Sequence, residues 1–92
     1  MHTIHKGSER VMLQDQASAT DLILSLTVLG CTEALKNQFI LGNKEQLEVY
    51  EVSFLDKHIK VLTQTDAEKV CHWMLDLGCQ KTSIEKLGGN TE

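Results

Sequence analysis

The sequence contains no proline, and its 92 residues include a single arginine, Arg10. Without proline, no helix or strand is interrupted by a residue that lacks a backbone N–H. Nine basic residues stand against 13 acidic ones, which gives a net charge of −4. A general nucleic-acid binder needs many phosphate contacts and usually relies on arginine, so we expect no sequence-specific DNA binding. The same charge balance argues against a polybasic membrane anchor.

Long apolar runs are also missing. The longest apolar-rich stretch, from Leu22 to Cys31, is interrupted by Ser25 and Thr27. It is much shorter than the ~20 residues that a membrane span needs. Residues 1–7 lack the apolar region of a secretory signal. We therefore expect a protein that neither crosses a membrane nor carries such a signal.

Cysteine is sparse and odd in number, with Cys31, Cys71 and Cys79. An odd count fits reduced thiols rather than a disulfide framework. No two cysteines have the Cys-x2-Cys spacing of a zinc site. The sequence also lacks Gly-x-Ser-x-Gly, His-Glu-x-x-His and a phosphate-binding glycine loop. We expect no metal, no cofactor and no catalytic residue, and hence a protein that is not an enzyme.

The residues that are present have the composition of a small folded domain. Hydrophobic residues make up 41% and charged residues 24% of the chain, which is typical of a globular protein. We expect a single compact domain over residues 1–92. Its last residues, about 88–92, read Gly-Gly-Asn-Thr-Glu and are expected to form a disordered tail.

A shift of 48 residues aligns two segments that have the same apolar spacing. Seven positions of the first segment match seven of the second: Ala19, Leu22, Ile23, Leu26, Leu29, Gly30 and Cys31 fall on Ala67, Val70, Cys71, Met74, Leu77, Gly78 and Cys79. Steps of three and four residues are typical of a helix face turned to a core. The pattern predicts helices at about 18–30 and 66–78. It is either a true duplication or the coincidence of two similar amphipathic helices.

The ends of both predicted helices carry capping residues. Ser18 and Asp66 precede the two apolar runs and are candidate N-caps. Thr20 or Thr65, one or two residues away, could take that role instead. A glycine in the left-handed conformation is expected to end each helix, at positions 30 and 78.

Runs of strand-forming residues surround the helices. The last of them is either a weak strand or a frayed helix, and Ile4 is a candidate extension of the first. The change of alternation at Val49 and Tyr50 predicts a bulge or a strand covered on both faces. Turns are predicted at Gly42–Glu45 and at Leu55–His58. The predicted strands cover about 9–13, 34–41, 47–54, 58–63 and 82–87.

These elements follow the order β-α-β-β-β-α-(β). We expect an α+β fold in which two helices pack on one face of a mainly antiparallel sheet of four to five strands. The nearest named arrangement is the ferredoxin-like one, of which this fold would be a variant.

Basic residues gather at the second predicted turn. Lys57, His58 and Lys60 form the tightest basic group in the chain, and Lys36 on an earlier strand is a candidate extension. The group is either a solvated hairpin tip or a contact with an acidic surface or an RNA backbone. We include these four residues among the candidate partner-binding residues.

Carboxylates lie along the same predicted hairpin, at Glu45, Glu48, Glu51 and Asp56. They make a mimic of DNA phosphates the opposite alternative. A net charge of −4 is small for a mimic of a phosphate ladder, so mimicry is the less favoured interpretation.

The only tryptophan, Trp73, is the fifth candidate partner-binding residue. It lies between Cys71 and Met74, and the 48-residue shift places it opposite Ser25. Because Ser25 is polar and outside the shared apolar face, Trp73 is a candidate anchor on the outer side of its helix. The alternative is an ordinary, partly buried helix residue.

Taken whole, from Met1-His2-Thr3-Ile4-His5-Lys6 to the tail that begins with Gly88-Gly89, the chain resembles small phage-encoded anti-CRISPR proteins. It is most similar to inhibitors of the type I-F (Csy) surveillance complex. The resemblance implies a non-catalytic inhibitor that binds Cas proteins carrying guide RNA and blocks hybridisation or docking of target DNA. It also implies the cytoplasm of the infected bacterial host. These inhibitors share no motif, so the resemblance assigns no role to any residue.

A regulatory domain is the alternative from another class. It would be a ferredoxin-like homodimer that associates through its sheet and binds a small metabolite. The 48-residue similarity favours it slightly. The sequence leaves the oligomeric state open.

Overall fold

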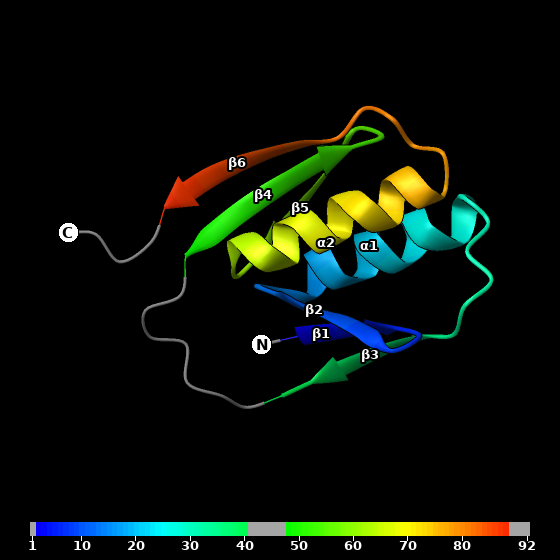
Figure 1. Cartoon of the computed structure of the whole chain (residues 1–92). Helices are drawn as coiled ribbons and strands as arrows, with labels where there is room; N and C mark the ends of the chain where they lie inside the picture. The colour runs from blue at the N-terminus through cyan, green and yellow to red at the C-terminus, as the bar shows by residue number, and fades with distance from the viewer. Residues whose placement is uncertain (1, 41–47, 89–92) are drawn as a thin grey trace.

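The computed structural model describes residues 2–40 and 48–88 of the chain. Two helices lie side by side on one face of a six-stranded antiparallel sheet (Figure 1). The elements in chain order are β1 (His2–Lys6), β2 (Glu9–Leu13), α1 (Gln16–Val28), β3 (Leu35–Phe39), β4 (Val49–Phe54), β5 (Lys57–Val61), α2 (Gln64–Asp76) and β6 (Ser83–Gly88).

The predicted α+β class is confirmed, with more strands than the four to five expected. The first additional strand is β1, which pairs with both β2 and β3. The last predicted segment is a true strand rather than a frayed helix, because β6 pairs with β4. The change of alternation at Val49 and Tyr50 coincides with a shift in the β4–β6 register. The predicted turn at 42–45 and residues 89–92 of the predicted tail lie outside the described residues. Gly88, which was expected to begin that tail, is instead the last residue of β6 and pairs with Val49.

The 48-residue offset applies to far more than the helices. It places β1 on β4, β2 on β5 and α1 on α2, so the fold consists of two ββαβ repeats. Pairing of the last strand is offset by 47 residues, because Asn37 faces Ile4 whereas Ile84 faces Val52. In each repeat the first strand lies between the other two, in the order β3-β1-β2-β5-β4-β6. Each repeat therefore contains the split β-α-β unit of ferredoxin-like folds.

The two repeats meet where β2 runs beside β5. Leu13 and Val61, which are equivalent under the offset, are the paired residues of these strands. Two further backbone hydrogen bonds flank them, from Gln14 N to Lys60 O at 2.9 Å and from Leu62 N to Met12 O at 3.2 Å. These two bonds also correspond under the offset, so the junction has approximate two-fold symmetry.

The helices begin earlier than predicted, and other residues cap them. Asp15 and Thr63 are the N-caps, and their side chains accept hydrogen bonds from the backbone N–H groups of Ser18 and Asp66. Ser18 and Asp66 lie inside the first turns, where they are 4% and 6% exposed. The predicted left-handed glycines are confirmed, with φ of 93° at Gly30 and 96° at Gly78.

Ser18 and Asp66 instead satisfy backbone groups at the junction. The N–H of Lys60 donates to Ser18 Oγ at 2.9 Å, and the N–H of Met12 hydrogen bonds to the carboxyl group of Asp66. Beyond the central pair, β2 and β5 do not continue their ladder, and buried backbone donors need an acceptor. The helix α1 therefore supplies a hydrogen-bond acceptor to β5, and α2 supplies one to β2, so each helix bonds to a strand of the other repeat.

Candidate interaction surface at the β4–β5 turn

The β4–β5 turn holds two of the five candidate residues. Leu55 and Asp56 form its tip with positive φ angles of 50° and 61°. Lys57 and His58 follow as the first residues of β5, and both are exposed. We call the four residues Leu55 to His58 the turn surface. Such φ angles are unusual for leucine, which indicates that the surrounding structure holds this turn in its conformation.

His58 lies over the neighbouring strand β4. Its Nδ1 is 3.0 Å from Ser53 Oγ and 3.8 Å from Glu51 Oε1. Glu51 and Ser53 face the same side of the sheet as His58, since they alternate with the buried residues of β4. The imidazole is thus positioned by β4 while its outer edge remains exposed.

Lys60 lies further along β5 and is half-buried. It is paired with Glu51 in the sheet register. Burial alone raises the pKa of Asp15, but hydrogen bonds from Ser18 and the charges of Lys60 and His2 outweigh it, so that the pKa of Asp15 is lowered. Lys60 therefore contributes to the electrostatics of the α1 N-cap.

The expected extension of the basic group to Lys36 is wrong. Lys36 lies on β3, at the sheet edge beyond β1 and β2. Two strands, β1 and β2, separate it from β5. Sequence alone did not reveal this because β3 returns across its own repeat to pair with β1 rather than joining the second hairpin.

Trp73 is not a surface anchor, because its side chain is only 1% exposed. Its Nε1 donates to Glu9 Oε1 at 2.7 Å, and the ammonium of Lys6 lies 5.6 Å from the ring centroid. Ser25, its counterpart, is also buried, at 5%. This helix position thus faces inward in both repeats, and the polar Ser25 concealed this.

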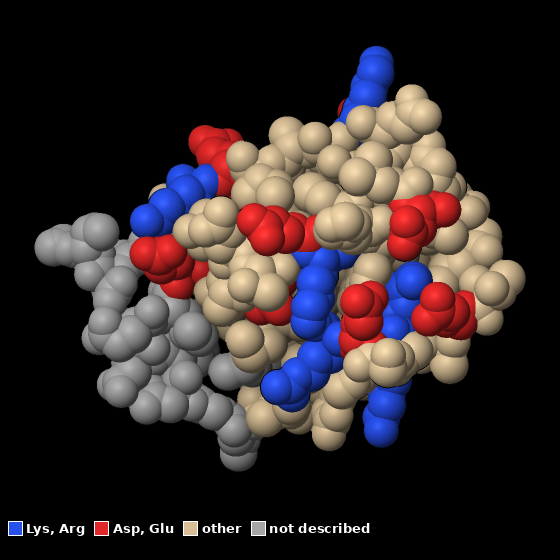
Figure 2. All heavy atoms as spheres, in the orientation of Figure 1, with Lys and Arg blue, Asp and Glu red and all other residues tan. Residues whose placement is uncertain are grey.

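The carboxylates of the second hairpin are partly neutralised. Glu48 accepts hydrogen bonds from the Tyr50 hydroxyl at 2.9 Å and from Lys86 Nζ at 3.2 Å. The bond from Tyr50, followed by that from Lys86, lowers the pKa of Glu48. Glu45 lies outside the described residues. Figure 2 shows acidic and basic side chains interspersed on the face that carries the helices, rather than separated into fields of one sign.

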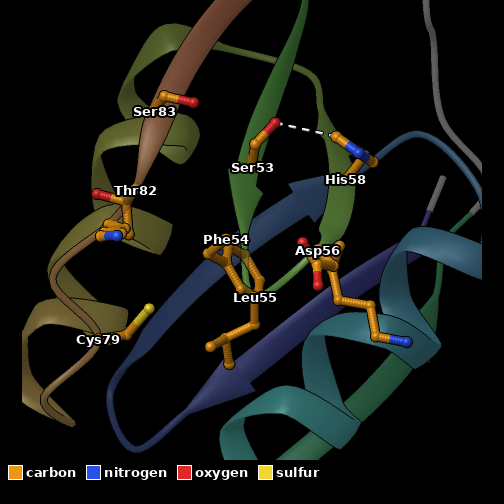
Figure 3. A pocket seen from close by; sticks show the side chains of 10 residues that line it. Ser53, Phe54, Leu55, Asp56, His58, Cys79, Thr82 and Ser83 are labelled. Carbon is orange, nitrogen blue, oxygen red and sulfur yellow. Dashed lines mark hydrogen bonds between the residues drawn. The ribbon is translucent and has the colours of Figure 1, made fainter.

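A cavity of about 490 Å³ opens between the turn surface and the segment that leads into β6. Figure 3 shows Leu55, His58 and Ser53 on one side of it and Cys79, Thr82 and Ser83 on the other. The lining combines polar and charged side chains with the apolar Phe54, Leu55 and Cys79, and such a mixture can orient a ligand. Sequence reasoning missed Leu55 and this cavity. The available signal was that the 48-residue offset places Leu55, an apolar residue, at the position of Gly7.

Among residues 2–40 and 48–88, no three His, Cys, Asp or Glu side chains gather as they would around a metal ion. Neither α1 nor α2 is long and apolar enough to cross a membrane.

Comparison of the chain with models of protein families, with curated proteins and with solved structures finds no match.

Proposed function

We propose that this protein is a non-catalytic inhibitor that binds a type I-F surveillance complex and prevents target DNA from hybridising or docking. The resemblance of the whole sequence to small anti-CRISPR proteins supports this proposal. The observation that carries it on the molecule is the turn surface. There an exposed leucine, a lysine and a histidine project from a constrained hairpin tip beside a cavity.

The physical basis would be occupation of a groove by a rigid domain. A stable complex of this kind buries roughly 1,200–2,000 Å² in total. Lys57 and His58 would meet guide-RNA phosphates or acidic side chains, whereas Leu55 would supply apolar contact. Because Lys57 is exposed, replacing it changes the surface without disturbing the core.

The test uses a purified type I-F complex assembled on its guide RNA and immobilised on a sensor. The wild-type chain should bind at saturable stoichiometry and reduce retention of target duplex DNA. Lys57→Glu should weaken binding and alter its salt dependence, whereas Lys36→Glu, with the same charge change at the opposite sheet edge, should not. Absence of wild-type binding at low ionic strength would refute the proposal.

The metabolite-binding homodimer is a second candidate, and the cavity of about 490 Å³ beside His58 favours it. Light scattering after size exclusion separates the two. A stable dimer whose melting temperature rises with one metabolite would favour the regulator, and a monomer indifferent to metabolites would favour the inhibitor.

A further inference from the structure

A second cavity lies on the other side of the turn surface. It measures about 390 Å³ and is lined by Leu24, Ser25 and Val28 of α1 together with Leu55 and Lys57. The three apolar side chains around it are unusually exposed, at 53% for Leu24, 79% for Val28 and 49% for Leu55. Apolar side chains gathered around a hollow are typical of an interaction site.

The repeat shows what the equivalent place in the fold contains. Under the 48-residue offset, Ser25 corresponds to Trp73 and Lys57 to Glu9. At the β1–β2 hairpin, the indole of Trp73 from α2 is buried and hydrogen bonded to Glu9. At the β4–β5 hairpin, α1 supplies only the hydroxymethyl group of Ser25, and the cavity is open. The cavity beside the β4–β5 hairpin thus occupies the place that an aromatic ring fills at the β1–β2 hairpin.

The charge at the rim is reversed between the two places. Glu9 accepts the indole N–H of Trp73 at 2.7 Å, whereas Lys57 offers an ammonium group, which only donates. An aromatic ring without an N–H group therefore suits the cavity beside Lys57 better than an indole does. An ammonium beside a ring favours a cation–π contact, and it also attracts a carboxylate.

We infer that this cavity, which we call the aromatic cradle, receives a phenylalanine or tyrosine side chain of the partner protein, flanked by an acidic residue that pairs with Lys57. This inference rests on the proposed function for the identity of the partner. The fit of an aromatic, acidic segment to the cradle can be tested without that partner.

The direct test titrates the ¹⁵N-labelled full chain with the peptide acetyl-Asp-Tyr-Asp-amide at low salt and follows its amide resonances. Shifts should concentrate at the last turns of α1 and at the turn surface. The matched peptide acetyl-Asp-Leu-Asp-amide should bind about threefold more weakly or worse, because the aromatic contribution is lost. Diffuse shifts, or equal affinity for the leucine peptide, would overturn the inference.

Two variants sharpen the test. Ser25→Trp supplies the missing ring from within the chain and should abolish the localised shifts. Val28→Asp reproduces the residue found at the equivalent position 76 and places a carboxylate on an exposed site. It should weaken peptide binding by about threefold, whereas Leu75→Asp on the exposed side of α2 should not. Persistence of the shifts in both Ser25→Trp and Val28→Asp would place the binding elsewhere.

The surveillance complex then separates the two proposals. If the wild-type chain binds the complex and Val28→Asp does not, the cradle belongs to that interface. Binding of the complex that is equal for wild type and Val28→Asp would overturn the cradle as a partner site and leave the proposed function standing. If the complex fails to bind the wild-type chain, the proposed function fails, and the peptide titration still decides whether the cradle accepts an aromatic, acidic segment.

Discussion

The indole N–H of Trp73 donates to a carboxylate oxygen of Glu9 at 2.7 Å, so that a helix of the second repeat is bonded to the hairpin of the first. Lys6, whose ammonium lies 5.6 Å from the centroid of the same ring, also forms an ion pair with Glu33 at 3.2 Å. Opposite the second hairpin, Ser25 makes no comparable contact with Lys57 among the interactions of the described residues. The two repeats thus share a backbone plan and differ in what fills the space between helix and hairpin.

Trp73→Ala should lower the free energy of unfolding by about 3–5 kcal/mol, because it removes a fully buried aromatic side chain. Trp73→Phe should cost less, about 1–2 kcal/mol, since it removes part of the buried ring and the hydrogen bond to Glu9, whose exposed carboxylate is then hydrated instead. Urea unfolding followed by circular dichroism measures both losses. Leu75→Ala, at a site that is 48% exposed, is the control and should change little. An unchanged stability in Trp73→Ala would mean that the ring is not part of the core.

Asp66 should make stability fall as the pH rises. Burial raises the pKa of Asp66 above its usual value of 3.8, although hydrogen bonds from Thr63 and Met12 and the charges of Lys69 and Arg10 oppose it. A raised pKa in the folded state means that the stabilising contribution is complete below the unfolded pKa and is lost as the pH rises through the folded one. Asp66→Asn removes this titration and retains an amide oxygen as an acceptor for Met12.

The measurement compares unfolding free energies of Asp66→Asn and wild type at several pH values between about 3 and 7. The difference should move in favour of the variant as the pH rises. Asp56→Asn, in the exposed turn, controls for the general loss of a negative charge. A difference that moves in favour of wild type over this range would show that the hydrogen bonds outweigh burial at Asp66.

Sequence patterns predicted the parts of this fold whose apolar spacing is local. The helices, their terminal glycines and most strands follow from such spacing. The strand β1 was missed because His2, Thr3, His5 and Lys6 leave only Ile4 as an apolar signal, and its stability comes from pairing on both edges. Pairing partners are far apart in the chain, so periodicity does not reveal them.

The candidate site was predictable only in part, for the same reason. Lys57 and His58 are adjacent in the sequence, and a turn could be predicted around them. The separation of Lys36 from that turn depends on strand order, and the burial of Trp73 depends on what faces it across the sheet. The aromatic cradle becomes visible only when the two repeats are aligned over all their elements.

Gly30 and Gly78 should be equally intolerant of side chains. Both have φ near +95°, and an added Cβ at either site would meet no atom within 4 Å. The cost of substitution is therefore conformational rather than steric, and valine at either position should lower stability by about 1 kcal/mol or more. Asparagine should cost less than valine, because it tolerates left-handed backbone better. Thermal unfolding of the four single variants tests this, and a silent valine at either site would contradict it.

Replacing Leu55 by glycine should weaken peptide binding without lowering the stability of the protein. It has a φ of 50°, and leucine in this region costs about 1–2 kcal/mol relative to a residue without Cβ restrictions. The equivalent residue, Gly7, has a φ of 62° and none of that strain. Leu55→Gly should therefore leave the free energy of unfolding unchanged or raise it, since the lost side chain is 49% exposed.

The same variant should weaken binding of acetyl-Asp-Tyr-Asp-amide, because it removes one wall of the aromatic cradle. Leu87→Gly, which removes a leucine that is 43% exposed on β6, is the control for loss of an apolar side chain and should leave peptide binding intact. If Leu55→Gly instead lowers stability and leaves the peptide affinity unchanged, the leucine is retained for packing, and the strain at the turn has no role in recognition.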